Sequence, residues 1–255
     1  MTSDMVQGLS GKVALVTGGN QGVGRAIAQS LSAAGAHVVV ASRSTPDGVD
    51  GTGALDALRL NVTDEASCGR AVRECENRLG HLDILVNNAG IARSRKFVDT
   101  DTELWDQMMQ VNVKGPLWLI RAALPAMLER GQGRVVSVGS IASRVGMPYV
   151  SAYAASKHAL LGLTRSLAAE YPTSGITFNC LCPSYVDTAM TAATVDNIVA
   201  KTGCSREDAL RPLLNPQGRL VQAGEIAALC TLLASDQGRS ITGQAINVDG
   251  GYLQS

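Results

Sequence analysis

The chain has 255 residues, of which 45% are hydrophobic and 17% are charged, so it is long enough to bury a large core. Its 22 basic and 22 acidic side chains give a net charge of zero, which offers no electrostatic footprint for nucleic acid or an anionic membrane. No apolar run approaches the roughly 18 residues of a membrane-spanning helix, and the start of the chain lacks a signal-peptide pattern. The composition therefore predicts a soluble, cytoplasmic protein and leaves small acidic or neutral ligands open.

Strand and helix signals alternate from residue 13 onward, which predicts a parallel sheet covered by helices on both faces of a single domain. Strands are expected at residues 13–16, 37–41, 57–60, 84–86, 135–138, 176–181 and 245–248. Helices are expected at 25–34, from a Thr63 cap to Gly80, at 102–130, around Tyr153 as far as residue 171, and at 225–234.

The turn after the first strand has the spacing Gly18-x-x-x-Gly22-x-Gly24. Glycine lets the backbone approach a pyrophosphate, and the N-terminus of the following helix offers free N–H groups. The spacing differs from the usual dinucleotide fingerprint because Ile27 occupies the place of its third glycine. A tight turn also needs glycine for structural reasons alone, but the position after the first strand favours a dinucleotide site.

Ser42, Arg43 and Ser44 follow the second strand, where NAD sites usually carry an acid and NADP sites an arginine. The guanidinium and the missing acid favour NADP(H). Asp47 or Asp50 could fold back to the ribose, which leaves NAD(H) open.

Polar or small residues follow two further strands at the carboxyl edge, where open parallel sheets bind ligands. They are Asn61 and Val62, expected beside the adenine, and the sequence Asn-Asn-Ala-Gly at 87–90. Gly115-Pro116 should interrupt the 102–130 helix, because proline removes a backbone donor. A kink at Asn112 could turn a carbonyl or a side-chain amide toward the cleft, or Asn112 could merely stabilise the kink.

Tyr153 and Lys157 stand four residues apart, so they share one helix face. An ammonium beside a phenol favours tyrosinate and lowers the tyrosine pKa, which suits proton transfer; the alternative is a solvated surface pair. Ser140 follows the fifth strand at the same sheet edge. Residues 189–216 read as polar helical pieces that suit a lid over a substrate.

The six cysteines are scattered without nearby histidines, so no metal site is expected. Cys180 and Cys182 alternate in an apolar stretch and are interpreted as reduced packing residues.

The order and spacing of these motifs resemble the classical short-chain dehydrogenase/reductase family over nearly the whole chain. The residues that carry the resemblance are Thr17-Gly18-x-x-x-Gly22-x-Gly24, the 87–90 turn, Asn112, Ser140, Tyr153-x-x-x-Lys157, and Pro183 with Thr188. Residues 61–64, 241–243 and 250–251 look like those of 3-oxoacyl carrier-protein reductases. The resemblance implies a doubly wound Rossmann sheet of about seven strands and a homotetramer.

The resemblance also implies roles for individual residues. Tyr153 would be the acid/base, and Lys157 would lower its pKa and bind the nicotinamide ribose. Ser140 would orient the substrate oxygen, and Asn112 would hold a water in a proton relay. The implied cofactor site comprises Gly18, Asn20, Gln21, Gly22, Val23, Gly24, Ser42, Arg43, Asn61, Val62, Asn88, Ala89, Gly90, Tyr153, Lys157, Pro183, Val186 and Thr188.

Two positions depart from the family pattern. Ser184 replaces the usual glycine after Pro183, and Asn20 and Gln21 stand where many NADP-using relatives carry a basic residue. The preference for NADP therefore depends mainly on Arg43.

The leading prediction is an NADP-dependent reductase of a 3-oxoacyl thioester, a polyketide-like ketone or another small ketone, or the reverse alcohol oxidation. An NAD-linked dehydrogenase of a 3-hydroxy acid or other small secondary alcohol is the enzyme alternative, and a non-catalytic dinucleotide sensor is the alternative from another class. Arg93, Arg95 and Lys96 could attract an acidic substrate or a carrier phosphate.

Overall fold

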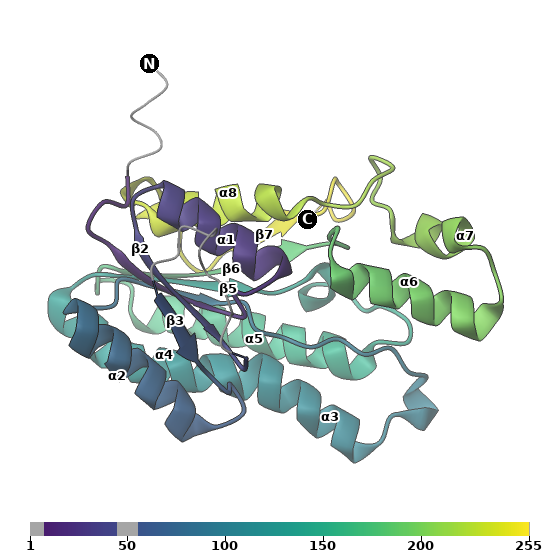
Figure 1. Cartoon of the computed structure of the whole chain (residues 1–255), viewed down its shortest axis with the longest axis horizontal. Coiled ribbons are helices and arrows are strands. Elements are labelled where there is room, and N and C mark those ends of the chain that lie inside the picture. Colours follow the sequence, from purple (N-terminus) through teal and green to yellow (C-terminus); the bar gives the residue numbers. More distant parts are fainter. Residues whose placement is uncertain (1–7, 45–55, 255) are drawn as a thin grey trace.

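The computed structural model describes residues 8–44 and 56–254 and contains one sheet of seven parallel strands (Figure 1). The strands are β1(Val13–Thr17), β2(His37–Ser42), β3(Asp56–Arg59), β4(Ile84–Asn87), β5(Gly133–Val138), β6(Ile176–Pro183) and β7(Ala245–Val248). Their spatial order is β3-β2-β1-β4-β5-β6-β7, so the direction of winding reverses between β1 and β4. This order confirms the predicted doubly wound α/β fold.

Helices cover both faces of the sheet. The longer helices are α1(Gly22–Ala33), α2(Glu65–Leu79), α3(Thr102–Met109), α4(Gly115–Arg130), α5(Ser151–Glu170), α6(Ala189–Thr202) and α8(Ala223–Ala234), and α7(Arg206–Leu210) is short. α1 and α8 pack on one face, while α2, α4 and α5 pack on the other. In Figure 1, α6 and α7 extend to the right beyond the sheet.

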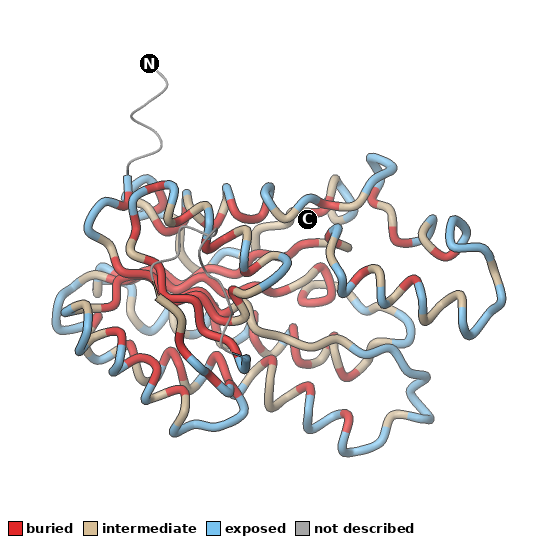
Figure 2. The backbone as a smooth tube through the Cα atoms, viewed as in Figure 1, coloured by how far each residue is buried: buried red, intermediate tan, exposed pale blue. Residues whose placement is uncertain are grey.

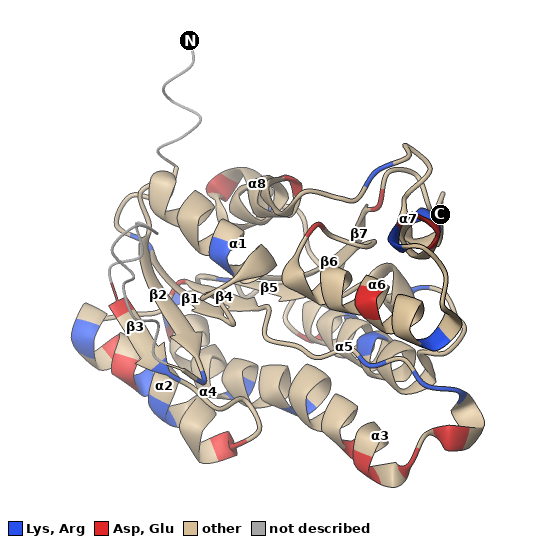
Figure 3. Ribbon diagram, turned by 45° about the vertical axis from the view of Figure 1, so that its right-hand side comes forward, with Lys and Arg blue, Asp and Glu red and all other residues tan. Residues whose placement is uncertain are grey.

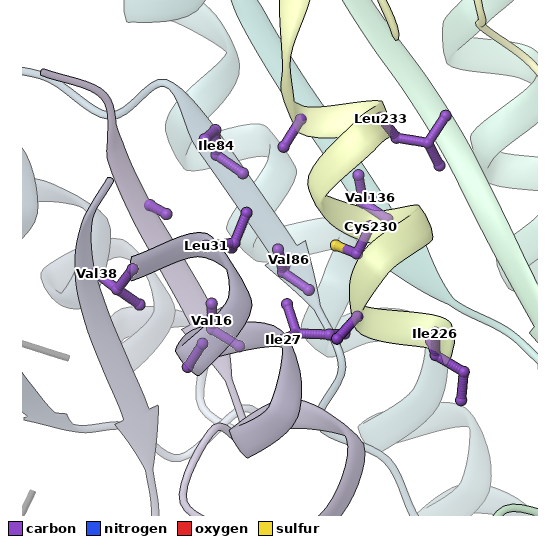
Figure 4. Close-up of a cluster of buried hydrophobic side chains, with 14 of the residues drawn as sticks. Val16, Ile27, Leu31, Val38, Ile84, Val86, Val136, Ile226, Cys230 and Leu233 are labelled. Atoms are coloured by element: carbon purple, nitrogen blue, oxygen red, sulfur yellow. The ribbon is translucent and has the colours of Figure 1, made fainter. Parts of the chain in front are cut away.

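The hydrophobic core lies in two layers, one on each face of the sheet. All five residues of β1 are buried, as expected of a central parallel strand whose two faces are covered (Figure 2). Figure 4 shows one layer, in which Ile27 and Leu31 of α1 and Cys230 of α8 lie over Val16 and Val86 of the sheet. This packing fixes α1, and with it the glycine-rich turn, against the carboxyl end of β1.

Two predicted helix starts are wrong. α1 begins at Gly22 rather than at residue 25, so Gly22 and Gly24 form its first turn. α2 is capped by Asp64, whose carboxylate accepts a 2.9 Å hydrogen bond from Ala66 N–H. Thr63 does not cap the helix because its hydroxyl donates to the Asn61 side chain at 2.9 Å.

The predicted interruption near Asn112 is confirmed as a π-helical turn, η2(Gln110–Lys114), between α3 and α4. There the Gly115 N–H donates to the Gln110 carbonyl, five residues back. The α-helical donor for the Asn112 carbonyl would be residue 116, which is proline and has no N–H. The sequence at 115–116 thus removes one backbone donor at the end of the turn.

Charged residues of both signs are spread over the helices in the view of Figure 3. In the described ranges, no helix is long and apolar enough to cross a membrane. The cysteines are free thiols, five of them buried, which confirms the packing interpretation of Cys180 and Cys182.

Candidate active site

The glycine-rich turn at the end of β1, residues 18–24, forms a cradle that carries no side chain at Gly18, Gly22 and Gly24. Gly18 and Gly22 have φ of 63° and 52°, in the left-handed region that favours glycine. A Cβ at Gly24 would overlap the Gly18 carbonyl and the Asn88 side-chain nitrogen. A Cβ at Gly22 would lie 3.4 Å from Thr188. The three predicted segments that contain Gly18, Asn88 and Thr188 therefore meet at one edge of the sheet.

The N-terminus of α1 opens onto this cradle. Its N-cap residue, Gln21, makes no side-chain capping bond, and the first turn holds no acidic residue. Uncapped N–H groups and the positive end of the helix dipole suit an anionic group. Val23 packs its side chain against the core, so only its backbone is available to an anionic group. These residues fit the pyrophosphate of a dinucleotide.

Thr17 joins the two turns, a role that the predicted site omitted. Its hydroxyl accepts 3.0 Å hydrogen bonds from the N–H groups of Asn88 and Ala89 and donates to the Val86 carbonyl at 3.2 Å. The Asn88 side chain returns a 2.9 Å bond to the Thr17 carbonyl. A hydroxyl at a strand end directly before a glycine turn was the available signal in the sequence.

The end of the cleft at β2 and β3 carries the predicted selectivity residues. Leu60 N–H donates to the Ser42 carbonyl at 2.8 Å, which brings Asn61 and Val62 beside the end of β2. Ser42 is buried and donates its hydroxyl to the Ser44 carbonyl. Arg43 is exposed and makes no ion pair with any residue that the structure describes. Asp47 and Asp50 lie outside the described residues.

Some of the predicted residues in this part of the site are engaged locally. The Asn61 side-chain oxygen accepts from the Thr63 N–H at 3.2 Å, so it serves the turn before α2. Val62 is buried and packs in the core beneath α2 and α4. The Asn61 side-chain oxygen and the buried Val62 side chain are therefore already engaged within the protein, and only the remaining atoms of these two residues can border a ligand.

Ser140, Tyr153 and Lys157 come together where β5 ends and α5 begins. Tyr153 hydrogen-bonds the side chain of Ser140. Lys157 is 5% exposed, and its Nζ lies 5.7 Å from the centre of the Tyr153 ring. The same Nζ donates to the Val138 carbonyl at 2.8 Å. The geometry thus rejects the solvated-pair alternative, because Lys157 is buried and bonded to the end of β5, and Tyr153 is partly buried.

Burial shifts the pKa values of this pair toward their neutral forms. Desolvation raises the pKa of Tyr153 to about 12, while the hydrogen bond from Ser140 acts in the opposite direction. Desolvation lowers the pKa of Lys157 to about 8. The shift of the Tyr153 pKa is opposite to the predicted direction because the loss of hydration outweighs the hydrogen bond from Ser140.

The Asn112 side chain is fully occupied inside the protein. Its oxygen accepts from Ile91 N–H at 2.9 Å, and its nitrogen donates to the Ile91 carbonyl and to Ser156 Oγ, both at 3.0 Å. A Cβ at Gly90 would lie 3.2 Å from the Asn112 side-chain oxygen and 3.6 Å from Lys157 Nζ. Of the two groups considered, the side-chain amide is therefore engaged, which leaves the backbone carbonyl of Asn112 as the candidate for binding a water.

The segment after β6 completes the cofactor edge. Pro183 is the last residue of β6, and Val186 packs its side chain in the core. Thr188 donates its hydroxyl to the Val186 carbonyl at 3.3 Å. Ser184 N–H donates to the Val248 carbonyl at 3.2 Å, and Ser184 has no left-handed φ. The backbone path here therefore accommodates serine in place of glycine.

The predicted lid contacts the 91–100 loop. Asn197 on α6 donates to Ser94 Oγ at 3.4 Å.

Arg95 N–H donates to the carbonyl of Tyr149, which is the non-glycine residue with positive φ in the described chain. Arg95 also forms a 2.7 Å ion pair with Asp101, so it is neutralised, whereas Arg93 and Lys96 are exposed without an ion pair among the described residues.

Comparisons with known proteins agree with this geometry. Residues 12–198 match the family model described as short chain dehydrogenase. A 3-oxoacyl-[acyl-carrier-protein] reductase of Escherichia coli (strain K12) is 37% identical over 249 residues, with 94% of this chain and 97% of the relative covered. A D-beta-hydroxybutyrate dehydrogenase of Rhizobium meliloti (strain 1021) is 32% identical over 253 residues, with 94% and 98% covered.

Solved structures show the same fold. Levodione reductase superposes with a TM-score of 0.88 at 30% identity, with 95% of this chain and 98% of that chain covered. A variant of actinorhodin polyketide ketoreductase with NADPH superposes with a TM-score of 0.89 at 33% identity, with 94% and 97% covered. The chain therefore belongs to the short-chain dehydrogenase/reductase family, and it is an NAD(P)-dependent oxidoreductase similar to 3-oxoacyl carrier-protein reductases.

Proposed function

We propose that this enzyme uses NADPH to reduce the ketone of a 3-oxoacyl thioester or a polyketide-like compound to a secondary alcohol. The observation that carries the proposal is the grouping of Ser140, Tyr153 and Lys157 beside a glycine-rich turn whose geometry suits a dinucleotide. The reductase and ketoreductase relatives support the substrate class.

The bound cofactor would supply hydride to the carbonyl carbon. Tyr153 gives its proton to the carbonyl oxygen as negative charge develops there, and Ser140 donates a hydrogen bond to the same oxygen. Lys157 binds the nicotinamide ribose and, with a pKa near 8, returns a proton to Tyr153. The Asn112 backbone carbonyl holds the water that resupplies Lys157. In the reverse direction each proton moves the opposite way.

Replacing Tyr153 by phenylalanine tests the catalytic assignment. The variant keeps the ring and loses the proton, so kcat should fall by at least about 100-fold, because positioned acid–base catalysis contributes that much or more. Cofactor binding, followed by protein fluorescence, should persist. A retained rate with bound cofactor would contradict this role. A wild type that binds the cofactor but reduces no ketone would instead favour a non-catalytic dinucleotide sensor.

The proposed preference for NADPH depends on Arg43, whose guanidinium is free of ion pairs within the described chain. In Arg43→Ala the KM for NADPH should rise about tenfold or more, since a charge-assisted bond to phosphate is lost, and the KM for NADH should change little. Arg239→Ala, at an exposed position without an ion pair among the described residues, is the matched surface control. Equal effects of Arg43→Ala on both cofactors would remove the argument.

An NAD-dependent dehydrogenase of a 3-hydroxy acid is the second candidate, and the D-beta-hydroxybutyrate dehydrogenase relative is the observation that favours it. Fluorescence titration with NADH and NADPH separates the two, because only the first proposal requires tighter NADPH binding. Initial rates with a panel of ketones, acyl thioesters and 3-hydroxy acids would then identify the substrate.

The proposal extends to the whole protein as a single-domain, cytoplasmic homotetramer that acts on a small molecule and not on nucleic acid or membranes. Residues 189–216 close over the substrate, and the contact between Asn197 and Ser94 supports such a position of the lid. Sedimentation equilibrium tests the assembly, which requires a mass close to four times 26.5 kDa.

A further inference from the structure

A chain of directed hydrogen bonds runs through Ser156, a residue that lies between Tyr153 and Lys157 on α5. Ser156 is completely buried. Its hydroxyl donates to the Tyr153 carbonyl at 2.7 Å and accepts from the Asn112 side-chain nitrogen at 3.0 Å. The hydroxyl thus contacts two elements, α5 and the π-helical turn η2, at the position where both carry proposed catalytic residues.

The direction of each bond is determined by chemistry. A hydroxyl has one proton, and here the Tyr153 carbonyl takes it, so Ser156 can only accept from Asn112. The Asn112 amide must therefore turn its nitrogen toward Ser156 and its oxygen toward Ile91. That oxygen accepts a 2.9 Å hydrogen bond from the Ile91 N–H. Ser156 and Ile91 together leave the amide one orientation.

This orientation matters for the Asn112 backbone carbonyl, to which the proposed proton relay assigns a water. The Asn112 side chain links η2 to the rest of the site, because it hydrogen-bonds both Ile91 and Ser156 of α5. A π-helical turn has weaker internal support than an α-helix. Holding its central side chain from two sides keeps the Asn112 backbone at a constant place relative to Lys157.

We propose that Ser156 is a positioning residue that acts through Asn112 to hold the proton relay in register with Lys157. The inference rests on the proposed function and adds a residue that touches neither substrate nor cofactor. A serine hydroxyl that bonds a carbonyl three residues back is common in helices. The second bond, to a different element, is what distinguishes Ser156 from that ordinary case.

Thr164 provides the matched control. It is buried on the same helix, and among the described residues its hydroxyl bonds only the Leu160 carbonyl, at 2.9 Å. It therefore shares burial and back-bonding with Ser156 but not the bond to Asn112. Comparing Ser156→Ala with Thr164→Ala separates positioning from helix stability.

Three measurements test the proposal. Ser156→Ala should lower kcat about tenfold, the equivalent of one ordinary hydrogen bond, with an unchanged KM for NADPH. The Ile91 amide, which donates to Asn112, should exchange with deuterium faster. In an Asn112→Ala background the Ser156→Ala change should have no further effect on kcat, because the partner through which Ser156 acts is gone. Thr164→Ala should leave kcat and Ile91 exchange at wild-type values.

Equal kcat in Ser156→Ala and Thr164→Ala, or additive losses in the double variant, would overturn the inference. The proposed function would remain intact in that case, provided that wild type is active and Tyr153→Phe is not. An inactive wild type would refute the proposed function itself, while Ile91 exchange would still report on the bond between Ser156 and Asn112. If Ser156→Ala does not fold, Ser156→Cys preserves the side-chain volume and is measured in the same way.

Discussion

Lys157 donates a 2.8 Å hydrogen bond to the carbonyl of Val138, the last residue of β5. Ser140 follows two residues later, so the same strand end holds the lysine and leads to the serine. Tyr153 bonds that serine and lies one helical turn before the lysine. The relative positions of the three groups are therefore determined by the contact between one strand and one helix.

Replacing Lys157 by an uncharged residue should stabilise the fold. Its pKa is near 8 in the folded protein and 10.5 in the reference state, so burying the ammonium costs up to ~3 kcal/mol below pH 8. The unfolded chain binds the proton more tightly, so this cost disappears as pH rises from about 8 to 10.5. Lys157→Met should therefore be inactive yet more stable by about 1–2 kcal/mol at pH 7, after loss of the bond to Val138.

Urea denaturation of both proteins at several pH values measures this effect. The stability difference between Lys157→Met and wild type should shrink across pH 8 to 10.5. The raised pKa of Tyr153 acts in both proteins and largely cancels in the difference. A gap that stays constant over this window would show that burial of the charge is not its source.

Gly24→Ala should abolish binding of the dinucleotide. The added methyl would overlap the Gly18 carbonyl and the Asn88 side chain, which are parts of the cradle itself. Because one of the two is backbone, the turn must move to relieve the overlap. Fluorescence titration with NADPH measures the loss of affinity. Unchanged affinity would show that the close packing of Gly24 against Gly18 and Asn88 is not required for binding.

Gly162→Ala on α5 is the matched glycine control. A Cβ at this exposed helical position meets nothing within 4 Å. Alanine should raise the unfolding free energy by about 0.5–1 kcal/mol, since glycine loses more chain entropy in a helix. NADPH affinity should remain at the wild-type value.

Thr17→Val should loosen the joint between the two turns. Valine keeps the shape but removes the acceptor for the N–H groups of Asn88 and Ala89, which costs about 1–3 kcal/mol when such groups are left unpaired. Thermal unfolding should show a lower Tm, and NADPH should bind more weakly. Thr17→Ser, which retains the hydroxyl, should restore both properties; a failure to do so would place the effect in packing.

Several features of the site were predictable because they depend on neighbours in the chain. Apolar runs located all seven strands, and the order of motifs placed Gly18, Asn88, Ser140 and Tyr153 at one sheet edge. The break at Asn112 followed from proline chemistry at residue 116. Helix starts were less predictable, as Thr63 and Asp64 are both good caps and the bond between Thr63 and Asn61 decided between them.

Local periodicity and backbone chemistry are sufficient to predict the parallel sheet, the glycine cradle and the pairing of Tyr153 with Lys157 on one helix face. The tertiary structure, in contrast, determines how Asn112 is used, since its partners Ile91 and Ser156 lie 21 and 44 residues away in the chain. It also decided the direction of the Tyr153 pKa shift. Desolvation sums over every group packed around the phenol, and no spacing in the sequence records that sum.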